Sequence, residues 1–150
     1  MVNVGIIGAG RIGQVHMNSI VTRVPNAKIR AVADPFLSEA ADKKAKEAGA
    51  EYTTKDYKEV LADSEIDAVI ICSSTDTHSP ISIDAIKAGK HVFCEKPIDH
   101  DVEKIKEVIE TLKGTNLKYQ VGFNRRFDHN FEAAQRAVAE GKIGEPHIIK

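Results

Sequence analysis

The sequence contains no tryptophan, only 5 per cent aromatic residues and no marked excess of charge of either sign. Scarce aromatic side chains argue against stacking platforms for single-stranded nucleic acid. A net charge of −1, with acidic and basic residues mixed along the chain, argues against a nucleic-acid surface or a polybasic membrane patch. No apolar run approaches the length of a membrane span, and no basic segment followed by a long apolar core opens the chain. We therefore expect no nucleic-acid partner, no membrane partner and no secretory signal.

Cysteine is also scarce, since only Cys72 and Cys94 are present. Two cysteines cannot form a disulfide framework, and their spacing matches no metal motif. They are most simply small buried side chains, and we expect no metal site. A reducing, cytoplasmic location is the default expectation.

The 150 residues suffice for one domain, and 42 per cent hydrophobic with 29 per cent charged residues is typical of a soluble globular protein. Short β-branched runs alternate with longer amphipathic stretches. We expect strands at Val2–Ile7, Lys28–Ala33, Glu51–Thr53, Ala68–Cys72, His91–Cys94, Leu117–Val121 and His147–Ile149, and helices at Ile12–Val24, Leu37–Ala48, Tyr57–Leu61, Ser79–Ala88 and Phe131–Ala139, with one more helix whose apolar face is Val102, Ile105, Val108, Ile109 and Leu112. Strands separated by helices pair in parallel through right-handed crossovers. The prediction is an α/β fold, a doubly wound parallel sheet between two helical layers, which binds ligands at the carboxyl ends of its strands.

A glycine-rich turn follows the first expected strand and opens the first helix. Its residues are Gly8, Ala9, Gly10, Arg11, Ile12 and Gly13. Gly8 permits the tight turn, Gly10 allows the backbone to approach a pyrophosphate, and Gly13 allows the helix to pack closely on the strand. The helix N-terminus then offers free N–H groups to phosphates. An ordinary strand–helix turn is the alternative, but the context favours a dinucleotide-binding Rossmann fold.

Asp34 ends the second expected strand, 21 residues after Gly13. An acid about 20 residues after the glycine motif accepts hydrogen bonds from the adenosine ribose. The alternative is a turn or capping aspartate before Pro35. A carboxylate at this position repels a 2′-phosphate, so NAD is favoured over NADP. Arg11 is a mild signal against this preference for NAD, because its side chain could lie near phosphates.

Small hydroxyl residues and a histidine follow the buried strand that ends at Cys72. Ser73, Ser74 and Thr75 are candidate contacts to the ribose or phosphates of the cofactor, and His78 is a fourth candidate in the same segment. Thr75, Asp76 or Thr77 could instead cap the next helix, and the two roles are compatible. From its spacing, His78 is as consistent with a surface histidine as with a site residue.

Charged residues follow the next two strands. Glu95 and Lys96 come directly before Pro97, and a lysine beside a nicotinamide can hydrogen-bond a substrate oxygen and assist its proton transfer. The alternative is an exposed lysine before a proline turn. Arg125 and Arg126 are candidate cofactor and substrate contacts, or members of a solvated ion-pair cluster with Asp128. His16, one turn into the first helix, is more simply a packing residue than a chemical one.

Taken together, the motifs resemble the glucose–fructose oxidoreductase, inositol dehydrogenase and MocA family of nicotinamide-dependent oxidoreductases, and within it most resemble inositol 2-dehydrogenases. The similarity rests on VGIIGAGRIGQVH at Val4–His16, SSTDTHSPISIDAIKAGKHVFCEKP at Ser73–Pro97, and GFNRRFD at Gly122–Asp128. It implies an N-terminal dinucleotide domain followed by a substrate domain that also carries oligomer contacts, with a homotetramer as the expected assembly. It also implies that Lys96 is the active-site lysine and that the bond before Pro97 is cis.

The resemblance implies a function as well: hydride transfer to NAD from a secondary alcohol of a sugar or polyol resembling myo-inositol, with Glu95, Lys96 and Arg125 at the cofactor and Lys96 and Arg126 at the substrate. We expect residues 1–150 to be the cofactor domain, with Pro146–Lys150 beginning the substrate domain. This domain by itself would bind cofactor without turnover. An NAD-dependent glycoside hydrolase of the same family and a non-catalytic nucleotide-binding module remain as alternatives.

Overall fold

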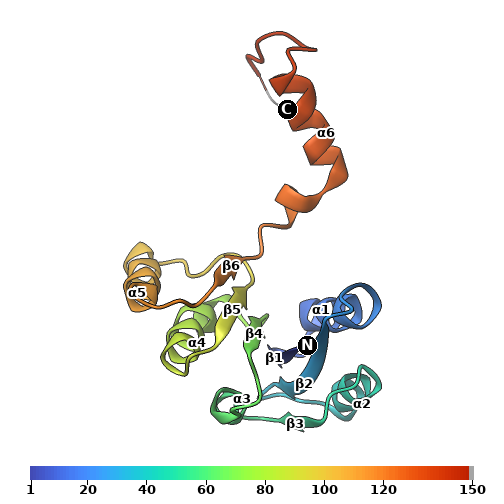
Figure 1. Ribbon diagram of the computed structural model, residues 1–150, viewed down its shortest axis with the longest axis vertical. Helices are drawn as coiled ribbons and strands as arrows, with labels where there is room; N and C mark the ends of the chain where they lie inside the picture. Colours follow the sequence, from blue (N-terminus) through green and yellow to red (C-terminus); the bar gives the residue numbers. More distant parts are fainter. Residues whose placement is uncertain (149–150) are drawn as a thin grey trace.

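A computed structural model describes residues 1–148 and contains one six-stranded sheet in which every pairing is parallel (Figure 1). The strands are β1 (Val2–Ile7), β2 (Ala27–Ala33), β3 (Tyr52–Thr54), β4 (Ala68–Ile71), β5 (His91–Cys94) and β6 (Tyr119–Val121). The helices are α1 (Arg11–Arg23), α2 (Glu39–Glu47), α3 (Tyr57–Ala62), α4 (Thr75–Lys87), α5 (Val102–Leu112) and α6 (His129–Ala139), with a 3₁₀ turn at Asn124–Phe127. The doubly wound parallel sheet expected from the sequence is confirmed.

The strand order is β3-β2-β1-β4-β5-β6. The chain winds outward from β1 to β3, returns to the middle, and winds outward again from β4 to β6. The order therefore reverses between β1 and β4, where the two crossovers leave in opposite directions. At such a point the loops after the strands separate and leave a crevice at the carboxyl edge of the sheet.

Two apolar layers cover the sheet. On one face, α1 and α2 pack Met17, Ile20 and Ala45 against the sheet. On the other face, α3, α4 and α5 contribute the side chains Val60, Leu61, Ile81, Ala85, Ile86 and Val108. Alternate residues of β4 enter the two layers, Val69 and Ile71 one and Ile70 the other, as expected for a central strand covered on both faces.

Side-chain caps define where several helices begin. Ser38 Oγ accepts from the Ala41 N–H at 3.2 Å, so α2 begins after Ser38 rather than at Leu37. Asp56 and Asp101 cap α3 and α5 in the same way.

The predicted start of α4 at Ser79 is wrong by a full turn, because the helix begins at Thr75 and contains Pro80 in its second turn. Pro80 suggested a helix start at Ser79, because the N–H that proline lacks would have no intrahelical partner in a first turn. Here the Thr77 N–H bonds to Ser74 O at 2.9 Å, and the first turn forms upstream of the proline. The segment from Thr75 to His78 is therefore helical rather than part of a loop.

The apolar face predicted for α5 is only partly correct. Val108 is buried, whereas Val102 and Ile109 are largely exposed. This helix covers the edge of the sheet next to α4, so only a narrow stripe of its surface meets the core.

The C-terminal part of the described chain leaves the sheet. Figure 1 shows α6 extending away from the layers, and none of its residues is buried. Phe127 is 70 % exposed and Phe131 is 50 % exposed. The strand predicted at His147–Ile149 is absent at His147 and Ile148, while Ile149 lies outside the described residues.

Candidate functional site

The glycine turn has the shape that a bound phosphate requires. Gly8 has a φ of +103°, and a methyl group there would lie 2.6 Å from the Cys72 carbonyl carbon. A methyl group on Gly13 would overlap the Gly8 carbonyl oxygen, so α1 packs directly on the turn. Open space surrounds Gly10, which precedes α1 without a side-chain cap, and the first turn of α1 has no acidic residue. The first N–H groups of α1 thus have no side-chain cap, which fits a pyrophosphate.

Asp34 joins the glycine turn to the end of β2. Its Oδ2 accepts from the Ala9 N–H at 2.7 Å, and its Oδ1 accepts from the Phe36 N–H at 2.8 Å. Each carboxylate oxygen has a second acceptor position, so a ribose hydroxyl can still donate to Asp34. The turn-forming role and the ribose role are therefore compatible.

A cleft of about 690 Å³ lies over the reversal point at the carboxyl ends of β1, β2 and β4. Of the predicted cofactor residues it brings together Gly8, Gly10, Asp34, Ser73 and Ser74. Arg11 and Ile12 are exposed on the first turn of α1, and neither they nor Thr75 lines this cleft. Lys55 and Tyr57 do line it, although sequence reasoning did not select them. Lys55 comes from the loop after β3, and Tyr57 is the first residue of α3. Neither segment contains a sequence motif that indicates a cofactor site.

The hydroxyl residues after β4 do not cap α4 in the way considered from the sequence. Ser73 Oγ pairs with Thr77 Oγ1 at 2.6 Å, and Thr77 Oγ1 donates to Ser74 O at 2.7 Å. Ser74 occupies the position before α4, without a side-chain capping bond. Capping by Thr75, Asp76 or Thr77 is thus not found, because the helix begins earlier than predicted. The Ser74 side chain is left exposed at the cleft.

His78 lies in the interior, with only 2 % of the residue exposed. Nδ1 is 2.7 Å from Pro97 O, and Nε2 is 3.0 Å from Ser73 O. Carbonyl oxygens only accept, so both ring nitrogens donate and the ring is an imidazolium. Burial disfavours that charge, but the contacts with Cys94 and the two carbonyls outweigh it and raise the pKa of His78 to about 9. His78 therefore joins the loop after β4 to the Lys96–Pro97 turn after β5.

The Lys96–Pro97 peptide bond is cis, as the resemblance implied. Lys96 is exposed and lines a hollow of about 550 Å³ together with Phe123, Asn124, Arg125 and Arg126. The lining therefore carries three cationic side chains and no carboxylate. Such a lining attracts an oxygen that is acquiring negative charge.

Asp128 does not form the ion-pair cluster considered from the sequence. Its Oδ1 accepts from the N–H groups of Asn130 and Phe131, which makes it the cap of α6. The Arg125 guanidinium lies instead over the Phe131 ring, 4.7 Å from its centre. Local helix capping determines the position of the carboxylate, and Arg126 remains directed to the hollow.

Glu95 contacts a residue that sequence reasoning set aside. His16 Nε2 lies 2.9 Å from Glu95 Oε1, across 79 residues of chain. Glu95 is at the carboxyl end of β5 and His16 is on the glycine-turn helix α1. No local pattern in the sequence indicates this contact, since it forms only when α1 packs beside β5.

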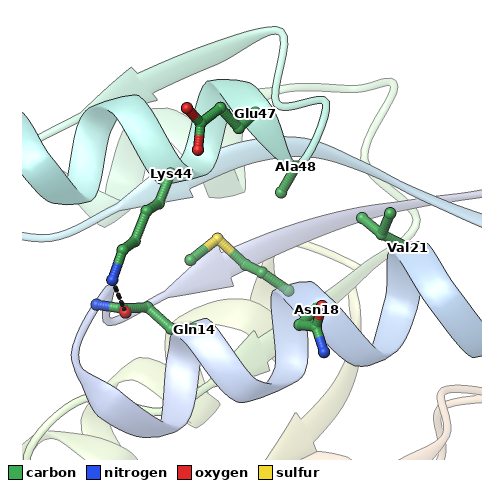
Figure 2. Close-up of a pocket in the computed structure, with 7 residues that line it drawn as sticks. Gln14, Asn18, Val21, Lys44, Glu47 and Ala48 are labelled. Atoms are coloured by element: carbon green, nitrogen blue, oxygen red, sulfur yellow. Dashed lines mark hydrogen bonds between the residues drawn. The ribbon is translucent and has the colours of Figure 1, made fainter.

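A separate hollow of about 310 Å³ lies between α1 and α2 (Figure 2). Gln14 reaches across from α1, and its Oε1 accepts from Lys44 Nζ at 2.7 Å, while its Nε2 donates to Ala9 O at 3.2 Å. Gln14 thus holds α2 against the glycine turn. The hollow also contains Met17 and Val21 and lies apart from Lys96.

Within residues 1–148, no group of three or more histidine, cysteine, aspartate or glutamate side chains is placed to hold a metal ion. Cys94 is fully buried and Cys72 partly so, and burial raises the pKa of the Cys72 thiol. In the same range, no helix has the length and apolar character needed to cross a membrane.

Comparison with known proteins identifies the family. The family model described as "Oxidoreductase family, NAD-binding Rossmann fold", that of glucose–fructose oxidoreductase, inositol dehydrogenase and MocA, matches residues 2–123. The chain belongs to this family. The family and the NAD cofactor predicted from the motifs are thereby confirmed.

Its relatives include inositol dehydrogenases. The chain is 44 % identical to an inositol 2-dehydrogenase of Rhizobium meliloti over 99 % of this chain and 44 % of the relative. It is 40 % identical to a myo-inositol 2-dehydrogenase of Thermotoga maritima over 98 % of this chain and 43 % of the relative. The crystal structure of scyllo-inositol dehydrogenase from Lactobacillus casei with bound NAD(H) and scyllo-inositol has a TM-score of 0.88 and 38 % identity, covering 97 % of this chain and 43 % of that one. The chain thus spans less than half the length of these relatives.

Proposed function

We propose that this chain is the cofactor domain of an NAD-dependent dehydrogenase that oxidises a secondary alcohol of a sugar or polyol. The observation that carries the proposal is the placement of Lys96 and Arg126 in one hollow, at the same edge of the sheet as the glycine turn and Asp34. The cleft holds the groups that bind a dinucleotide, and the hollow holds cations suited to an alcohol oxygen. The inositol dehydrogenases among the relatives support a polyol as the substrate class.

The cofactor residues have separate tasks in this proposal. The glycine turn, with the N–H groups of Arg11, Ile12 and Gly13 at the start of α1, receives the pyrophosphate. Asp34 receives the adenosine ribose and disfavours a 2′-phosphate. Ser73, Ser74 and Thr75 lie toward the phosphates or the second ribose, with Glu95 and Arg125 on the far half of the sheet. NAD, when bound, accepts a hydride from the substrate.

Lys96 and Arg126 act on the substrate in this proposal. The Lys96 ammonium donates to the alcohol oxygen and stabilises the negative charge that develops as its proton leaves. Arg126 helps to orient the substrate, because it lines the same hollow.

His78 enters the proposal as a positioning residue rather than as a cofactor contact. Both of its ring nitrogens are already bound to backbone carbonyls, and the ring is buried. It holds the turn that carries Lys96 close to the loop that carries Ser73.

The whole protein is proposed to contain more than this domain. The chain spans 42–44 % of the length of the relatives it resembles. We propose a second domain, beginning near Pro146, that supplies further substrate contacts and the surfaces of a homotetramer. A cytoplasmic location is part of the same proposal.

Fluorescence titration with NADH tests the binding part of the proposal on this chain, which lacks tryptophan and so adds no competing emission. We expect saturable binding that is tighter than that of NADPH. The activity part requires the complete enzyme with myo-inositol or scyllo-inositol and NAD. Net NADH formation supports the dehydrogenase, whereas glycoside cleavage without net NADH would identify the hydrolase alternative, and cofactor binding without any turnover would identify a binding module.

A further inference from the structure

His16 and Glu95 form a contact between two parts of the sheet edge that have different tasks. His16 lies on α1, whose N-terminus faces the proposed pyrophosphate position. Glu95 directly precedes Lys96. Their side chains are 22 % and 21 % exposed, so the 2.9 Å contact is partly shielded from water. The carboxylate oxygen can only accept, and therefore His16 Nε2 donates.

The packing around this contact leaves little freedom for either side chain. The His16 ring meets the Phe93 ring edge-on, with centroids 5.2 Å apart. On the other side, a methyl group placed on Gly122 would lie 3.1–3.2 Å from the Glu95 carboxyl atoms. Glu95 Oε2 is also 3.3 Å from the Lys96 N–H. The carboxylate is thus bordered by His16, the Lys96 N–H and Gly122.

We propose that His16 is a positioning residue that fixes the Glu95 carboxylate and, with it, the turn that carries Lys96 at the nicotinamide half of the cofactor site. The inference rests on the proposed function. Asp34 marks the adenosine half of the site, over β2, and Glu95 lies on the opposite side of the reversal point. Loss of the contact therefore affects the nicotinamide half and leaves the adenosine half intact.

The test compares NADH with ADP, which contains only the adenosine and pyrophosphate parts of the cofactor. His16→Phe keeps an aromatic ring beside Phe93 but removes the donor. We expect this variant to bind NADH roughly tenfold more weakly, the lower range for a hydrogen bond to a charged group. Its affinity for ADP should stay within about twofold of that of the original chain. ADP binding is measured by calorimetry.

Three further variants separate positioning from folding. His16→Gln places an amide donor at a similar reach and should recover most of the NADH affinity. Glu95→Met removes the acceptor and should weaken NADH binding by itself, and its effect should not add to that of His16→Phe, because both remove one contact. His129→Phe is the matched control, since the His129 side chain is 98 % exposed on α6. It should bind both ligands as the original chain does.

The outcomes distinguish a failure of the proposed function from a failure of the positioning role of His16. If the original chain binds neither NADH nor ADP, the proposed function fails. If it binds both, but His16→Phe weakens both equally or neither, the positioning role is overturned. If His16→Phe does not fold, as judged by circular dichroism, His16→Leu, which also removes the donor, serves as the test, and it must weaken NADH without weakening ADP.

Discussion

The charged histidine inside the protein makes stability depend on pH in a defined window. His78 has a pKa of about 9 in the folded chain, whereas a histidine in the unfolded chain has the ordinary value of 6.5. The folded form therefore holds the proton more tightly. The stabilisation of the folded chain by this bound proton is fully present below pH 6.5 and is lost as the pH rises through 9.

The size of the effect follows from the two pKa values. Each pH unit of displacement corresponds to about 1.4 kcal/mol, so the free energy of unfolding should fall by about 3 kcal/mol between pH 6 and pH 10. This is a large part of the stability of a typical domain. Above pH 9 the neutral ring can donate to only one of the two carbonyls, Pro97 O or Ser73 O. The other carbonyl then loses its partner in the interior.

Urea unfolding followed by circular dichroism at several pH values measures this fall. His78→Gln is the comparison, because glutamine keeps a donor but does not titrate. The difference in unfolding free energy between the two proteins should shrink from pH 6 to pH 10. Cys94 contacts the ring, so both proteins are also measured with Cys94→Ala. A constant difference across this range would refute the buried imidazolium.

Three other predictions concern the cofactor, the substrate and the exposed helix. Asp34→Ser should weaken NADH binding and narrow or reverse the preference over NADPH, because the carboxylate that repels a 2′-phosphate is gone; unchanged NADH affinity in a fluorescence titration would argue against the ribose role. In the complete enzyme, Lys96→Met should lower kcat by roughly a hundredfold or more with little change in NAD affinity, and near-normal steady-state turnover would make Lys96 an ordinary exposed lysine. The exposed rings of Phe127 and Phe131 should cause this chain to self-associate, and replacing both by serine should reduce the mass seen by light scattering; a monomer at high concentration before substitution would contradict this.

Local patterns determined most of the architecture. The alternation of apolar strands with amphipathic helices predicted all six strands of the sheet and their parallel pairing, since crossover handedness leaves few topologies. The glycine turn was predictable because two of its requirements are local: Gly8 has a positive φ, and Gly13 packs on the Gly8 carbonyl oxygen five residues away. Asp34 was also predictable, because its distance along the chain from the glycine turn is set by one βαβ unit.

Burial and long-range contacts were decided only by the tertiary structure. Nothing in the neighbourhood of His78 in the sequence indicates an interior imidazolium, which depends on carbonyls from two separate loops. Lys55 reaches the cleft only because the loop after β3 lies next to β2. His16 meets Glu95 across 79 residues because the parallel sheet brings α1 beside β5. The spacing of residues in the sequence predicts local geometry. The charge, solvent exposure and partners of a side chain depend instead on which distant segments pack around it.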